Sequence, residues 1–106
     1  MPKYLFTGSY SAAGAAGVLK EGGSGRLAAT EKLVSSVGGR VEAYYFAFGG
    51  DDFYLIAELP DSVSAAAMSL SAAASGALSV RTVVLLTPEE IDAASRQSVT
   101  YRAPGA

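Results

Sequence analysis

The stretch FGGDDFYLIAELP, residues 48–60, joins a turn to a strand and indicates how the chain folds. Glycine and aspartate favour tight hairpins, because they tolerate positive φ angles or hydrogen-bond their own backbone. An aromatic run, 40–48, precedes the turn and an apolar run, 53–59, follows it, so the two runs are expected to pair as strands. Adjacent residues of an extended backbone point to opposite faces. We therefore interpret Asp51 and Asp52 as turn residues rather than a catalytic or metal-binding pair.

The remaining segments extend this hairpin into a complete fold. Strands are predicted at 3–10 and 77–86, and helical stretches at 11–20 and 26–37 on either side of a break, EGGSG, at 21–25. Asp61 is expected to cap a helix that buries Val63, Ala66, Ala67, Leu70 and Ala74, and Thr87-Pro88-Glu89-Glu90 begins a last helix, to about residue 98. The order is β-α-β-β-α-β plus one helix. It predicts an α+β, ferredoxin-like single domain over 1–106 with a tail at 99–106.

The composition narrows the chemistry and the partners. The 106 residues include no cysteine and no histidine, which excludes disulfides, Ser-His-Asp catalysis and histidine-ligated metals, so we expect neither cofactor nor metal. The net charge of −2, with scattered Lys and Arg, gives no footprint for nucleic acid. No apolar run is long enough for a membrane span and no signal peptide is evident, so we expect a cytoplasmic protein.

The strands at 40–48, 53–59 and 77–86 carry apolar residues on both faces. Such strands are normally covered on both sides, and the helices of a ferredoxin-like chain cover one side only. A second subunit is the simplest cover for the other face. The sequence therefore predicts a homodimer or higher homo-oligomer.

Several short motifs resemble the GYD domain family of small bacterial proteins over roughly residues 3–87. They are Gly14, Arg26, Gly38-Gly39, Gly49, Pro60-Asp61, Gly76 and Val80-Arg81-Thr82. The turn Gly49-Gly50-Asp51-Asp52 corresponds to the G-x-Y-D turn of the family name, with Asp51 at the tyrosine position. The resemblance implies the dimeric α+β barrel group, in which two ferredoxin-like sheets face each other around a cavity.

Aromatic residues on the strands are the candidate ligand-binding residues: Tyr4, Tyr10, Tyr44, Phe46 and Tyr54. Packing in a subunit interface is the alternative, because aromatic clusters often fill such contacts. Glu42, Glu58 and Arg81 are the candidate catalytic residues, since charges within apolar strands are costly to bury unless paired. Three placements are open for these residues: at the solvent-exposed rim of the sheet, in a salt bridge between subunits, or as polar groups in a cavity. The hairpin register decides whether Glu42 and Glu58 share a face: a two- or four-residue turn puts them on opposite faces, and a three-residue or bulged turn brings them together.

The segment GSGRLA, residues 23–28, formally matches the dinucleotide pattern G-x-G-x-x-A. It follows a helix rather than a strand, so we reject nucleotide binding through it. Backbone amides near Gly25, with Lys20 and Arg26 close by, leave an anion site at a helix start open. The simpler interpretation is a flexible interruption between two helical pieces.

Three classes of function follow. The first is an oligomeric module that binds a small hydrophobic or aromatic molecule. The second, which the barrel group implies, is a cofactor-independent isomerase, cyclase or monooxygenase. In that case Glu58 or Glu42 would be a base whose pKa burial raises, Arg81 would hold an oxyanion, and Tyr4 or Tyr44 would orient the substrate. The third is a purely structural assembly protein.

Overall fold

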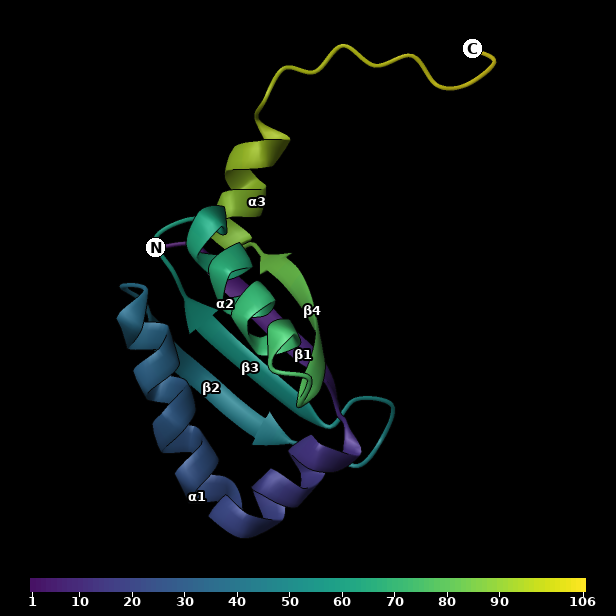
Figure 1. Cartoon of the computed structure of the whole chain (residues 1–106). Helices are drawn as coiled ribbons and strands as arrows, with labels where there is room; N and C mark the ends of the chain where they lie inside the picture. The colour runs from purple at the N-terminus through teal and green to yellow at the C-terminus, as the bar shows by residue number, and fades with distance from the viewer.

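One antiparallel sheet of four strands forms the frame of the molecule, in the order β2-β3-β1-β4 (Figure 1). In the computed structural model, which describes residues 1–106, the strands are β1 (Lys3–Tyr10), β2 (Arg40–Phe46), β3 (Phe53–Glu58) and β4 (Leu78–Leu85). The hairpin β2–β3 forms as predicted. This strand order, with helices between β1 and β2 and between β3 and β4, is consistent with the ferredoxin-like fold and confirms the predicted class.

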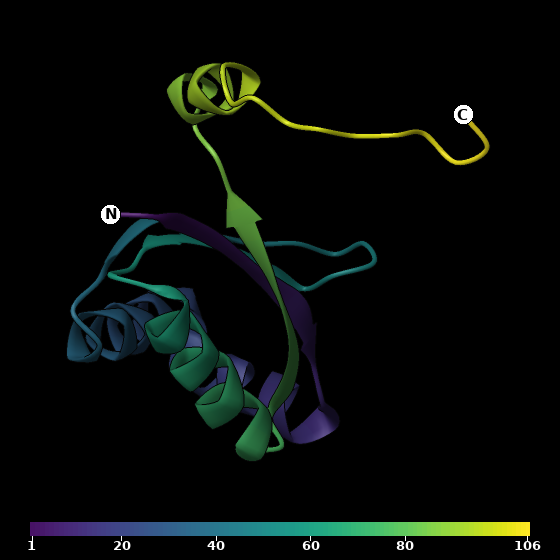
Figure 2. The same cartoon turned by 90° about the horizontal axis from the view of Figure 1, so that it is seen from above.

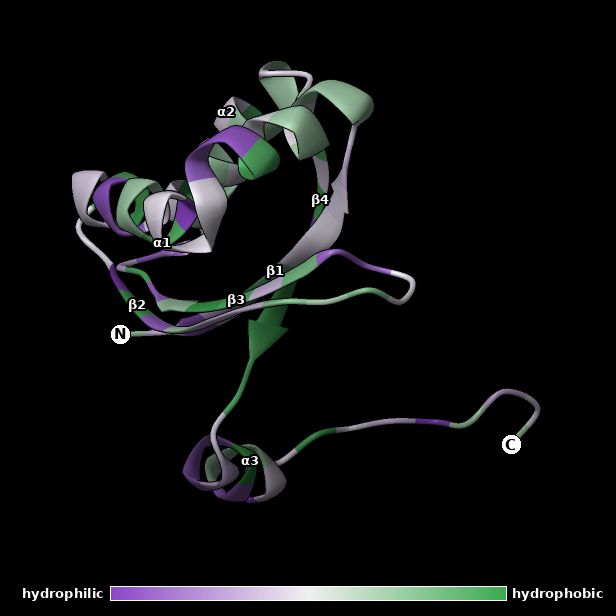
Figure 3. Ribbon diagram, turned by 90° about the horizontal axis from the view of Figure 1, so that it is seen from below, coloured by the Kyte–Doolittle hydropathy of each residue, from purple (hydrophilic) through white to green (hydrophobic).

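Two helices cover one face of the sheet and leave the other face open. Both α1 (Ala12–Ser36) and α2 (Ser62–Ala74) lie on the same side, which Figures 2 and 3 show with the sheet edge-on. The third helix, α3 (Pro88–Ser95), projects beyond β4 on the opposite side, followed by the extended tail. None of the three helices combines the length and the apolar character needed to cross a membrane.

The predicted break in the first helical region is a single sharp bend. At Gly22 the backbone has φ 75° and ψ 170°, and helical geometry resumes on both sides of it within α1 (Figure 1). A positive φ is inexpensive for glycine alone, so Gly22 sets the position of the bend. The expected five-residue interruption at 21–25 is therefore wrong in extent, and the remaining residues of EGGSG are helical.

The core lies between the sheet and the helices. Its buried members are Tyr4, Phe6, Val34, Leu55, Ala57, Leu59, Ala65 and Met68. The predicted buried face of α2 is wrong: Ala65 and Met68 point inward, whereas Val63 and Leu70 are 77% and 71% exposed. The helix is rich in alanine, so several of its faces are about equally apolar and the periodicity does not choose between them. Met68, the larger side chain, faces the core instead.

The start of α1 is held tightly against the turn that follows α2. The Ser11 backbone N–H donates to the Ala77 carbonyl at 2.9 Å, and the Ser11 hydroxyl donates to the Gly76 carbonyl at 2.9 Å. A Cβ on Gly14 would lie 1.9 Å from the Ala77 carbonyl oxygen, so only glycine permits this approach. These contacts fix one end of the space between the two helices.

Candidate functional site

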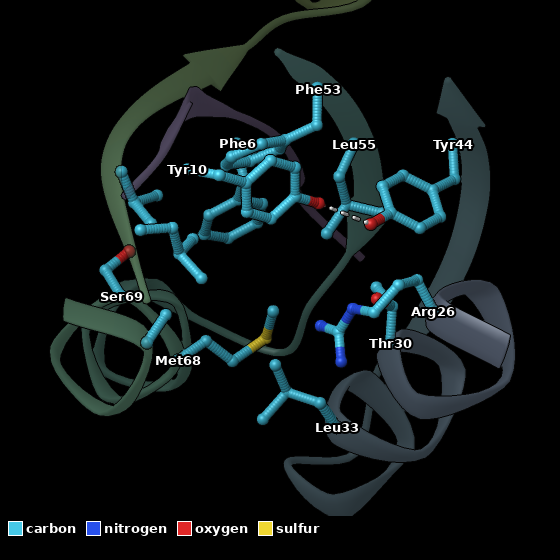
Figure 4. Close-up of a pocket in the computed structure, with 13 residues that line it drawn as sticks. Phe6, Tyr10, Arg26, Thr30, Leu33, Tyr44, Phe53, Leu55, Met68 and Ser69 are labelled. Carbon is cyan, nitrogen blue, oxygen red and sulfur yellow. Dashed lines mark hydrogen bonds between the residues drawn. The ribbon is translucent and has the colours of Figure 1, made fainter. Parts of the chain in front are cut away.

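The pairing of β2 with β3 decides which side chains face the helices. Tyr44 lies opposite Leu55 and Phe46 opposite Phe53. Tyr44, Leu55 and Phe53 line the space under the helices (Figure 4), and Phe46 packs beside Tyr44 and close to Gly23 of α1. A β-bulge between Val41 and Ala43 makes Glu42 the extra residue and breaks the strict alternation. As a result Glu42 and Glu58 both reach Lys3. The two glutamates meet through this bulge within β2 rather than through a three-residue or bulged turn.

A cavity of about 70 Å³ lies between the sheet and the two helices, over the central strands (Figure 4). Ten of its 13 lining residues are hydrophobic, and they come from all four strands and from both α1 and α2. The lining comprises Phe6, Tyr10, Arg26, Thr30, Leu33, Tyr44, Phe53, Leu55, Met68, Ser69, Ala72, Leu78 and Val80. Concave apolar sites with a few polar groups are the usual form of small-molecule sites.

The polar groups of the cavity gather at one corner. The hydroxyl oxygens of Tyr10 and Tyr44 lie 3.5 Å apart and point toward one another, and the Arg26 side chain extends from α1 toward them (Figure 4). Burial, followed by the contact with Tyr44, raises the pKa of Tyr10 above its usual value. Tyr10 therefore stays protonated at neutral pH and presents a hydrogen-bond donor.

A second hollow of about 370 Å³ adjoins this cavity, between the first part of α1 and the end of α2. It shares Tyr10, Arg26, Leu33, Ala72 and Leu78 with the inner cavity, so the two spaces meet at these residues. A depression of about 660 Å³ on the outer side of α1 is larger, but only three of its eight lining residues are hydrophobic. The inner cavity with its adjoining hollow is therefore the candidate site.

The aromatic candidates occupy three different places. Tyr10 and Tyr44 line the cavity, and Phe46 packs beside Tyr44 with 5.1 Å between the ring centroids. Tyr4 is buried in the core, where its hydroxyl lies 3.1 Å from that of Ser62. Tyr54 belongs to the open face, paired across from Thr7 and Tyr45.

The charged candidates lie on the open face of the sheet, away from the cavity. At one end, Arg40 Nε lies 2.6 Å from Glu58 Oε2 and Lys3 Nζ lies 3.4 Å from Glu58 Oε1, while Lys3 also pairs with Glu42. Partial burial alone would raise the pKa of Glu58, but Arg40 and Lys3 outweigh it and hold that pKa below its usual value. This is opposite to the raised pKa expected of a catalytic base.

At the other end of the open face, Arg81 pairs with Asp51 rather than with either glutamate. The Thr7 hydroxyl lies 2.7 Å from Asp51 Oδ2, and the hydrogen bond from Thr7, together with Arg81, outweighs burial and lowers the pKa of Asp51. Asp52 points elsewhere: its carboxylate accepts from the Tyr10 backbone N–H at 2.9 Å, and its own N–H donates to the Gly8 carbonyl at 2.7 Å. Asp51 therefore connects the turn to both β1 and β4, and Asp52 connects it to β1 through separate hydrogen bonds.

Sequence reasoning missed the part of the site that comes from the helices. Arg26 was noted in a motif and as a possible anion contact, but not as a cavity residue, and Thr30 and Met68 were not singled out. The spacing of Arg26, Thr30 and Leu33 at intervals of four and three residues places them on one helical face, which was the available signal. No three acidic side chains gather at any point, so the chain presents no carboxylate cluster for a metal.

These features define a class: a single-domain α+β protein of ferredoxin-like topology with an apolar cavity between its sheet and helices. The family model of the GYD domain matches residues 4–95, and the chain belongs to the GYD domain family. Searches of curated proteins and of solved structures return no significant match. Asp51, which the sequence resemblance sets at the tyrosine position of the G-x-Y-D turn, links the turn to Arg81 and Thr7.

Proposed function

We propose that this protein is an oligomeric module that binds a small hydrophobic or aromatic molecule in the cavity between its sheet and helices. The observation that carries the proposal is the cavity itself, with ten hydrophobic residues among its 13 lining residues and a few polar groups at one corner. A well-packed core leaves few voids larger than a water molecule, because each void forfeits dispersion contacts. A bound apolar molecule would recover those contacts.

The enzymatic alternative lacks comparable support. A general base must come within hydrogen-bonding reach of its substrate, and Glu42 and Glu58 lie on the opposite face of the sheet from the cavity. Both carboxylates are engaged by Lys3, and Glu58 also by Arg40. Arg81, the expected oxyanion holder, is paired with Asp51. Binding needs none of these groups in the cavity.

The oligomeric part of the proposal is supported by the open face of the sheet. The register places Leu5, Ile56 and Val83 side by side across β1, β3 and β4, with the ion pairs of Glu58 and Asp51 at opposite ends. An apolar surface framed by polar groups is typical of a protein contact. In addition, no residue of α3 is buried, and this helix projects on the same side as the open face (Figures 2 and 3). A second copy of the chain would give both features a partner.

Binding can be tested through Met68, whose side chain points into the cavity (Figure 4). Methyl NMR spectra would be recorded during titration with two neutral probes, indole and phenylacetamide. The proposal predicts a saturable shift of the Met68 methyl signal for at least one probe. Ala72→Leu, which fills space at the junction of cavity and hollow, should abolish that shift.

The matched control is Ala73→Leu, the same change one residue further on, at an exposed position outside both spaces. It should leave the shift intact. If neither probe moves the Met68 signal while the chain still forms an oligomer, small-molecule binding is wrong and the purely structural alternative gains. A monomer by light scattering would contradict the oligomeric part alone.

A further inference from the structure

We propose that the ligand of the cavity is a carboxylate: its apolar body lies among the aromatic and aliphatic walls, and its charged group is held by Arg26 with the hydroxyls of Tyr10 and Tyr44. This inference rests on the proposed function and specifies the chemical class of ligand. Hydrogen-bond donors outnumber hydrogen-bond acceptors at the corner of the cavity formed by Arg26, Tyr10 and Tyr44.

Arg26 has unused capacity. Its only ion pair is with Glu21 of the same helix, at 3.6 Å between Nη1 and Oε2. That distance exceeds a good N–H···O hydrogen bond, so the contact is electrostatic rather than a formed bond. A guanidinium carries five N–H donors in a planar fork that fits a carboxylate at two points. Arg26 therefore faces the cavity close enough to Tyr10 to offset part of the rise in that residue's pKa, and its five-donor fork leaves further donors for a ligand (Figure 4).

The two tyrosines also have unused capacity. Their hydroxyl oxygens are 3.5 Å apart, beyond the usual 2.5–3.0 Å range of an O–H···O bond. A tyrosine hydroxyl is protonated at neutral pH even at its ordinary pKa of about 10, so both hydroxyls can act as donors. Both hydroxyls could turn their protons toward a ligand oxygen placed between them and Arg26.

Acceptors are scarce at this corner. The 13 lining residues of the inner cavity include no carboxylate and no side-chain amide, and the only other hydroxyls there are those of Thr30 and Ser69. The Ser69 hydroxyl is already 2.6 Å from that of Thr82. In the adjoining hollow the one carboxylate is that of Glu21, which at 3.6 Å offsets the Arg26 charge without forming a close hydrogen bond. A carboxylate ligand would supply the acceptors that the guanidinium and the tyrosine hydroxyls lack.

The position of Arg26 determines how the ligand lies. Arg26 and Tyr10 border both the inner cavity and the adjoining hollow, so the carboxylate would sit where the two meet. The inner cavity of about 70 Å³ is too small for a whole ring, so a ring would lie across the junction, with one edge in the inner cavity and the remainder in the hollow of about 370 Å³.

A matched pair of probes tests the charge preference on the unaltered protein. Phenylacetate and phenylacetamide have nearly the same shape and differ in charge. Each would be titrated against the full chain while the Met68 methyl signal is followed. We expect phenylacetate to bind about tenfold more tightly, since charge-assisted hydrogen bonds are roughly twice as strong as neutral ones. Equal affinities, or a preference for the amide, would overturn the proposal.

Arg26→Gln should remove the preference by weakening phenylacetate about tenfold while leaving phenylacetamide unchanged. Arg40→Gln is the matched control: Arg40 is ion-paired on the open face, and its replacement should change neither affinity. If Arg26→Gln does not fold, the comparison of the two probes on the unaltered protein still decides. Failure of both probes together with indole would contradict the proposed function itself, whereas binding of both with equal affinity would contradict only the carboxylate assignment.

Discussion

The two faces of the sheet use their polar residues in opposite ways. On the open face every charged side chain of the strands has a partner: Lys3 and Arg40 hold the glutamates at one end, and Arg81 holds Asp51 at the other. On the helix face the polar corner of the cavity has donors without matching acceptors, at Arg26, Tyr10 and Tyr44. The first arrangement is complete within the chain, whereas the second leaves donor capacity that the proposed ligand would use.

The apolar residues of the two faces differ in the same manner. Leu55 on the helix side is buried by its own chain, whereas Ile56, the next residue of β3, faces the open side and is partly exposed. The helix face therefore stabilises the single chain, and the open face is available to stabilise an assembly. Four sets of substitutions test this difference between the helix face and the open face of the sheet.

The largest effect is expected from Leu55→Ala. Truncating a buried leucine costs about 2–5 kcal/mol, from lost burial and an enlarged cavity. Ile56→Ala should cost the single chain clearly less, because its side chain is only partly buried there. Urea unfolding at low protein concentration measures both. Equal losses would show that the two faces do not differ within the chain.

The second change addresses assembly. Val83→Glu places a carboxylate in the middle of the open face and should weaken association at least about 100-fold, since an unpaired charge buried in an interface costs several kcal/mol. Val63→Glu puts the same charge on the exposed outer side of α2 and should have no such effect. Light scattering after size-exclusion chromatography gives the mass of each. The same mass for Val83→Glu and the unaltered protein would argue against assembly through this face.

The third change removes a polar contact of the open face. Thr7→Val deletes the buried hydroxyl that lies 2.7 Å from Asp51 Oδ2 and 2.8 Å from the Phe53 carbonyl. We expect a loss of about 1–3 kcal/mol, because the hydrogen bond to a carboxylate is replaced by an apolar group. Thermal unfolding would measure it, with Thr100→Val as the control at an exposed position of the tail. A loss no greater than that of the control would mean that Asp51 is held by Arg81 alone.

The smallest effect concerns pH. Because the folded-state pKa of Asp51 is lowered by Thr7 and Arg81, its contribution to stability is present above the ordinary aspartate pKa and is lost as pH falls through the folded value. Asp51→Asn should therefore be less stable than the unaltered protein near pH 7, and the difference should shrink below about pH 4. Asp92→Asn, on exposed α3, serves as the control. A difference independent of pH would contradict the ion-pair account.

The sequence determines the elements better than it determines the site. The signals that define the elements are local in the sequence: the turn residues at 49–52, the helix caps at Asp61 and Thr87, and the alternation along the strands. The predicted hairpin and the predicted starts of α2 and α3 are confirmed. Tyr44 and Phe46 share the helix side, and Tyr54 and Glu58 share the other side, as alternation predicts.

The site depends on features that local patterns do not encode. Strict alternation along the strand would put Glu42 on the same side as Tyr44. The bulge places it on the face of Glu58 instead, and nothing in the neighbouring residues indicates the extra position. The alanine-rich α2 gives no clear buried face, so the inward direction of Met68 could not be read from periodicity. The bend at Gly22 fixes how the two pieces of α1 lie over the sheet and where Arg26 points, which only the folded chain reveals.

One series of methyl NMR spectra tests the division between the two faces most directly. Met68 of α2 reports on the cavity, and Ile56 of β3 reports on the open face of the sheet. The account predicts that phenylacetate at constant protein concentration shifts the Met68 signal to saturation and leaves Ile56 in place. It also predicts that dilution of the ligand-free protein shifts Ile56 and leaves Met68 in place. A ligand that moves Ile56 but not Met68, or dilution that moves neither signal, would contradict it.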